Sequence, residues 1–156
     1  MWKMDMCINE VKISQMITTP EKAWHPIIFI RGEVASSKNS RRNFYGFNPK
    51  TGKKGMNSLP SAFASEYMGN ALKQLLVHRI AWFEGVRCVL LGKELEVGFF
   101  FNRKTNRRFD YINILQSVAD QMVKARYIED DCVEFFKPVF LGWKKDADNP
   151  GVEIYL

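Results

Sequence analysis

The chain has 156 residues, a length that suits one domain with one hydrophobic core. Its residues are 46% hydrophobic and 13% aromatic, which excludes a disordered chain, and its net charge of +6 favours a polyanionic partner. Because no apolar run approaches the roughly 20 residues that span a bilayer and the first residues lack the apolar core of a signal peptide, we expect a cytoplasmic protein without a membrane partner.

The first predicted boundary lies at residue 26. Residues 1–26 mix methionine with charged residues in no clear period and are predicted to be an N-terminal extension, with a helix start at Thr19 and Pro20. Residues 27–156 are predicted to form the folded domain. Its first element is an apolar strand from Ile27 to about Val34.

A polar segment rich in glycine and asparagine, Ala35–Asn57, follows this strand and is predicted to form a long loop or a hairpin. It contains three aromatic rings among basic residues, Phe44, Tyr45 and Phe47. Such rings more often hold a loop against the core, but they can also stack on nucleic-acid bases. The sequence leaves both roles open.

Two helices and two pairs of strands complete the pattern. The predicted helices run from Ser61 to about Arg79 and from Tyr111 to Ala125, with Asp110 as the N-cap of the second. The predicted strands are Val86–Leu91 and Leu95–Phe101, joined by a turn at Gly92–Glu94, and then Val133–Trp143 and Val152–Leu156. This order predicts an α+β fold with a single mixed or antiparallel sheet and two main helices.

The positive charge is concentrated in two acid-free segments, 36–54 and 102–108. They contain ten basic residues: Lys38, Arg41, Arg42, Lys50, Lys53, Lys54, Arg103, Lys104, Arg107 and Arg108. Because ten charges exceed the net charge of +6, the rest of the chain is mildly acidic and the basicity is local. Clustered cations of this kind are typical of surfaces that bind phosphate groups.

Three aspartates flank the second predicted helix: Asp110 at its start, and Asp130 and Asp131 after its end. Carboxylates are ligands that Mg²⁺ and Mn²⁺ prefer, and such ions assist phosphodiester hydrolysis. The helix would be about 22 Å long, and the six residues that follow it reach about 20 Å when extended. The aspartates could therefore meet within one subunit if the chain doubles back at once, or across a dimer. Alternatively, Asp110 is only a helix cap and Asp130–Asp131 a solvated turn.

The run Arg108–Asn113, then Asp120, then Lys124–Asp131 resembles the RusA family of Holliday-junction resolvases. That family has an arginine-rich segment, D-x-D-N-x-x-K opening a helix, a further aspartate, K-A-G and a D-D pair, at matching spacing. Ser37–Ser40 and Pro150–Ile154 are similar to the family's segments after its first strand and in its last strand.

The resemblance covers about residues 27–156 and implies a RusA-like fold and a Mg²⁺- or Mn²⁺-dependent endodeoxyribonuclease of DNA recombination and repair. It implies a homodimer that resolves Holliday junctions and other branched DNA by paired nicks. The implied catalytic residues are Asp110, Asn113, Asp120, Asp130 and Asp131, of which Asp110, Asp130 and Asp131 would hold the metal. The implied DNA-binding residues are Lys38, Arg41, Arg42, Arg103, Lys104, Arg107 and Arg108.

Three positions depart from the family pattern. Ile112 stands where the family has its second aspartate, Gln116 where it has lysine, and Arg126 where K-A-G has glycine. Ile112 lies near the apolar face of the predicted helix, so packing is its expected role. The candidates to replace the missing carboxylate are Asp120 and Glu129, and those to replace the missing cation are Lys38, Arg108 and Lys124. One alternative is therefore an inactive relative that binds branched DNA without cutting it. Another is an interaction domain whose basic segments are only solvated surface.

Overall fold

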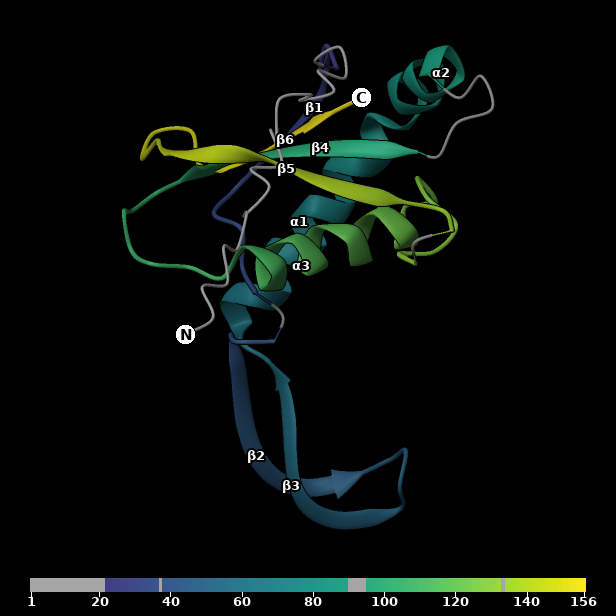
Figure 1. Cartoon of the computed structure of the whole chain (residues 1–156). Helices are drawn as coiled ribbons and strands as arrows, with labels where there is room; N and C mark the ends of the chain where they lie inside the picture. Colours follow the sequence, from purple (N-terminus) through teal and green to yellow (C-terminus); the bar gives the residue numbers. More distant parts are fainter. Residues whose placement is uncertain (1–21, 37, 90–94, 133) are drawn as a thin grey trace, which may run out of the picture.

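A four-stranded mixed sheet forms the centre of the fold (Figure 1). The computed structural model describes residues 22–36, 38–89, 95–132 and 134–156. The strands lie in the order β1 (Pro26–Arg31), β6 (Gly151–Tyr155), β4 (Glu96–Arg103) and β5 (Lys137–Lys145). Strand β6 is antiparallel to both of its neighbours, and β4 and β5 are parallel. The expected α+β class with a mixed sheet is therefore confirmed. The expectation of a single sheet with two main helices is wrong, because the described residues form a second, two-stranded sheet and three helices.

The centre of this sheet is β4, as its apolar sequence predicts. Val97, Phe99 and Phe101 are fully buried, and Gly98 between them is buried as well, so both faces of the strand are covered. Strand β5 begins later than expected, at Lys137, because residues 134–136 form a turn whose last ring, Phe136, packs edge-on against Phe99.

Two helices, α1 (Ala62–Val77) and α3 (Tyr111–Lys124), lie on the same side of the sheet and contact each other (Figure 1). Both begin as the sequence predicts. The Ser61 hydroxyl accepts a hydrogen bond from the Ala64 N–H at 3.1 Å, and Asp110 caps α3. Among the helices in the described ranges, none is both long and apolar enough to cross a membrane.

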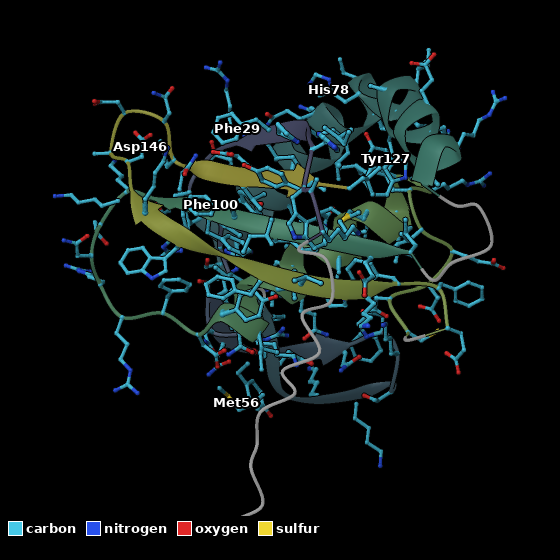
Figure 2. All side chains as sticks on the ribbon, turned by 45° about the horizontal axis from the view of Figure 1, so that its top comes forward. Phe29, Met56, His78, Phe100, Tyr127 and Asp146 are labelled. Carbon is cyan, nitrogen blue, oxygen red and sulfur yellow. The ribbon has the colours of Figure 1, made fainter. Side chains whose placement is uncertain are left out.

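A third helix, α2 (Arg79–Val89), occupies much of the segment for which the sequence predicts a strand, Val86–Leu91. That prediction is wrong because a short apolar run does not distinguish a strand from a partly buried helix. Trp82 and Val86, one helical turn apart, are both buried. Trp82 stacks on Tyr127 at 5.0 Å and donates its indole N–H to the Tyr127 carbonyl. Figure 2 shows Tyr127 beside this helix.

Residues on the N-terminal side of β1 already contact the domain. His25 exchanges two backbone hydrogen bonds with Leu156, and Lys22 forms an ion pair with Glu96 at 3.6 Å. The ordered contacts thus begin before residue 27. The predicted helix start at Thr19 and the predicted turn at residues 92–94 lie outside the described residues.

The polar segment after β1 forms a hairpin, one of its two predicted forms. Strands β2 (Arg41–Asn48) and β3 (Lys53–Pro60) pair with each other in a separate two-stranded sheet. The hairpin projects away from the main sheet, beyond α1 and α3 (Figure 1). We call residues 41–60 the arm.

Candidate metal and nucleic-acid site

Asp110 is held in one orientation at the start of α3. Its Oδ1 accepts hydrogen bonds from the Ile112 N–H at 3.0 Å and the Asn113 N–H at 3.4 Å. Its Oδ2 accepts one from the Asn113 side-chain amide at 2.7 Å. Asn113 therefore orients this carboxylate, and the side chain remains exposed to solvent. The same carboxylate caps the helix and is exposed to solvent. Its role as a cap therefore does not exclude a role in binding a cation.

A cleft of about 240 Å³ lies beside Asp110. Its polar lining comes from the segment after β1 and from the basic loop before α3: Glu33, Ser36, Asn39, Ser40, Arg103 and Arg108, together with Asp110. Glu33 is the residue that sequence reasoning missed. A single acid after a strand carries no signal of its own, and only the tertiary fold brings Glu33 to the cleft that Asp110 lines.

Arg103 is paired inside the fold, which alters its predicted role in DNA binding. Its Nη2 lies 3.0 Å from the Glu33 carboxylate, in a partly buried ion pair, and its guanidinium lies over the Phe109 ring at 4.7 Å. The Lys104 backbone N–H also donates to Glu33, at 2.6 Å. Because Glu33 neutralises Arg103, this arginine fixes the basic loop, while the exposed side chains of Arg107 and Arg108 remain available to phosphates.

A second acidic centre lies further along α3. Burial raises the pKa of the Asp120 carboxyl, and the neighbouring Asp131 carboxylate raises it further, while Lys124 and Lys38 oppose the shift. Asp120 and Asp131 are therefore close enough to repel each other, with Lys38 within electrostatic range. Carboxylate oxygens are the ligands that Mg²⁺ prefers in proteins, which makes these two residues candidates for holding a cation.

The turn after α3 explains why Asp131 approaches Asp120. The Tyr127 N–H donates to the Met122 carbonyl at 2.8 Å and the Arg126 N–H to the Val123 carbonyl at 2.9 Å, which is the hydrogen-bond pattern of a Schellman cap. Arg126 has a φ of 57°, in the left-handed region where glycine is usual. The chain changes direction here, and the loop that follows carries Asp130 and Asp131, the second of which acts electrostatically on Asp120. Asp130 Oδ1 accepts the Asp131 N–H at 2.9 Å, which shapes that loop.

The described residues contain no group of three or more acidic, histidine or cysteine side chains that could share one metal ion. Asp110, Asp130 and Asp131 thus do not form one metal cluster within a single chain. The helix explains this: Asp110 and Asp120 are ten residues apart, about 15 Å along the axis, and Asp131 returns to the neighbourhood of Asp120. A site completed across a dimer stays a prediction.

Ile112 does not pack into the core as the sequence analysis expects. Its side chain is 68% exposed on the first turn of α3. Ser117, a polar residue further along the same helix, is fully buried. The apolar stripe of a helix shows which face is buried on average, but the neighbouring elements decide how far the burial extends. Gln116 is half-buried.

No protein-family profile matches this chain, and no curated protein is similar to it in sequence.

Proposed function

We propose that this chain is a divalent-metal-dependent endodeoxyribonuclease that resolves Holliday junctions and other branched DNA by paired nicks. The observation that carries the proposal is the exposed carboxylate of Asp110, which Asn113 orients beside a cleft that Arg103 and Arg108 line. The acidic residues Asp120 and Asp131, whose charges act on each other, add to it further along the chain. The resemblance to RusA resolvases over residues 107–131 supports the same function. The left-handed backbone at Arg126 gives a physical reason for the glycine that the family has there.

In this proposal Asp120 and Asp131 hold an Mg²⁺ or Mn²⁺ ion, which neutralises charge on the phosphodiester and orients a water molecule for hydrolysis. Asp130 shapes the loop that presents Asp131. Lys38, whose charge acts on Asp120, would contact a phosphate of the DNA. Arg107, Arg108 and Lys104 form the exposed basic surface next to Asp110, and they position the DNA backbone.

Replacing Asp131 by Asn tests this assignment. The variant keeps the shape of the side chain but removes the charge, so we expect cleavage of a four-way junction in Mg²⁺ to fall by about 100-fold or more. Binding of the same junction, measured without metal, should survive. Asp148→Asn, in the exposed turn between β5 and β6, is the matched control and should cut normally. Normal cleavage by Asp131→Asn would show that the metal site is misassigned.

A second candidate function is binding of branched DNA without cleavage, and the exposure of Ile112 favours it. This isoleucine is 68% exposed on the helix turn next to Asp110, where burial gives no reason for an apolar residue and the RusA pattern has an acid. The double substitution Ile112→Asp and Gln116→Lys should then raise cleavage from background to a measurable rate. If the unmodified chain cuts junctions above background, this second candidate is excluded.

A further inference from the structure

The proposed catalytic chemistry does not use the arm. Its side chains include large apolar groups that solvent reaches: Phe44 40%, Tyr45 72%, Phe47 58%, Met56 71% and Leu59 43% exposed. Figure 2 shows Met56 at the margin of the molecule, away from the main sheet. The rings therefore do not hold the segment against the core, which leaves the other role that the sequence analysis kept open.

The charge of the arm selects the class of partner. Residues 36–65 contain no acid. The arm itself carries five cations: Arg41, Arg42, Lys50, Lys53 and Lys54. A polyanion would neutralise them, whereas pairing with the arm of a second copy would bring like charges together.

The spacing of the Tyr45 and Phe47 rings suits stacking on unpaired bases better than contact with the outer surface of a duplex. Tyr45 and Phe47 lie two residues apart on β2, so they leave the same side of the strand about 7 Å apart. That separation is about twice the 3.4 Å between stacked bases and leaves room for one base between two rings. Opposite them on β3 lie Met56 and Lys54.

A groove of about 470 Å³ runs along the arm, and Phe44, Phe47 and Met56 contribute to its lining together with Arg41 and Lys50. The Arg41 guanidinium donates to the Ser58 hydroxyl at 2.8 Å and to the Ser58 carbonyl at 2.7 Å, which links the two strands at the base of the arm. The groove thus combines apolar surface for bases with cations for the backbone, the combination found in proteins that bind single strands.

We propose that the arm binds unpaired nucleotides, with Tyr45 and Phe47 stacked on the bases and Lys50, Lys53 and Lys54 at its tip on the phosphates. Where branched DNA exposes unpaired nucleotides at its branch point, the arm would bind a feature that a linear duplex lacks. Only that placement at a branch point rests on the proposed function. The binding of unpaired nucleotides does not depend on cleavage.

The test is fluorescence anisotropy of the full chain in EDTA with three labelled probes: an oligo(dT) strand, a linear duplex and a four-way junction. For the double variant Tyr45→Ala and Phe47→Ala we expect affinity for oligo(dT) to fall by about tenfold or more, and affinity for the duplex to change little. Phe135→Ala, which removes an exposed ring outside the arm, is the matched control.

Two companion variants separate stacking from charge. Tyr45→Phe keeps a ring and should keep affinity for oligo(dT). Lys53→Gln with Lys54→Gln should weaken binding to all three probes and reduce its dependence on salt. The urea unfolding midpoint should be unchanged in every variant because these side chains lie outside the core.

Two outcomes would overturn the proposal. One is an unchanged affinity of the Tyr45→Ala, Phe47→Ala variant for oligo(dT). The other is a loss of self-association in that variant without a loss of oligo(dT) binding, which would make the arm a contact between two copies. Neither outcome bears on the catalytic assignment, which is tested separately by Asp131→Asn.

Discussion

At the scale of single residues, Asp110 combines two roles that are usually separate. Its carboxylate closes the first turn of α3 and remains exposed, while Asn113 fixes its orientation. A helix N-terminus also favours negative charge through the aligned peptide dipoles. A substitution that retains the cap but removes the carboxylate can therefore separate structure from chemistry.

Asp110→Ser keeps an N-cap but removes the carboxylate, and Asp110→Ala removes both. Serine is a good N-cap, so Asp110→Ser should unfold close to the midpoint of the parent, whereas Asp110→Ala should lose about 1 kcal/mol. If the carboxylate serves catalysis, both variants should lose junction cleavage. Urea unfolding measures the change in stability, and the nicking rate measures the change in cleavage. Full activity in Asp110→Ser would mean that Asp110 serves only as a helix cap.

Asp120 gives a prediction that depends on pH. Burial and Asp131 raise its pKa, so the folded state holds the proton more tightly than the unfolded state. Its contribution to stability is fully present below the ordinary pKa of 3.8 and is lost as pH rises through the raised value. Asp120→Asn removes this loss, so the variant should be more stable than the parent near neutral pH.

The same comparison has an internal control. At about pH 3 Asp120 of the parent is protonated and, like the asparagine of the variant, uncharged. The greater stability of Asp120→Asn in urea unfolding should therefore disappear. If Asp120 and Asp131 hold Mg²⁺ together, as we propose, adding the ion near neutral pH should stabilise the parent more than the variant. An advantage that persists unchanged at acidic pH would mean that Asp131 and burial do not act on Asp120 as described.

Local sequence made Asp110 predictable as a cap and Ser61 predictable as the residue that opens α1, because a helix start depends only on residues three or four positions away. Glu33 was not predictable, since its position depends on how the end of β1 meets the basic loop. The expectation that Ile112 packs into the core failed for a related reason: the elements that pack against α3, among them α1, decide which part of its surface is covered.

At the scale of elements, α3 and the turn that follows form one unit. The strong helical period of residues 111–125 fixed its bounds to within one residue, and the reversal at Arg126 carries the loop back toward Asp120. The segment of α2 was misread because its apolar run is too short to show a period, and its buried partner Tyr127 is distant in sequence.

Arg126→Gly tests the cap of α3. The left-handed conformation disfavours a residue with a side chain, and glycine adopts it without strain, so the variant should be more stable by about 0.5–1 kcal/mol. Urea unfolding measures the change. Substitution of Arg87, an exposed arginine in the last turn of α2, by Gly is the control and should lower stability, by about 1 kcal/mol at most. Destabilisation by Arg126→Gly would mean that the Arg126 side chain makes contacts that outweigh the backbone strain.

At the scale of the whole molecule, the position of the acids decides how many chains make a site. One chain brings Asp131 near Asp120, and Asp110 lies about 15 Å further along the helix. A homodimer on a two-fold junction would match paired nicks and could supply Asp110 from a second copy. The sequence resemblance implies the dimer, which stays a prediction.

Mixing two inactive variants tests a shared site. If Asp110 of one subunit works with Asp131 of the other, a heterodimer of Asp110→Asn and Asp131→Asn contains one site with both substitutions and one intact site. We therefore expect the mixture to recover nicking of a single strand, although each variant alone is inactive. No recovery in a mixture shown to exchange subunits would place the site within one chain.

The most direct test of the central claim is the rate at which the unmodified chain incises a four-way junction as Mg²⁺ is titrated. We predict no incision without metal, saturating incision as Mg²⁺ occupies the acidic pair, and paired nicks on opposite strands, with a linear duplex of the same sequence cut far more slowly. A chain that binds the junction but fails to incise it at any concentration of Mg²⁺ or Mn²⁺ would contradict the claim.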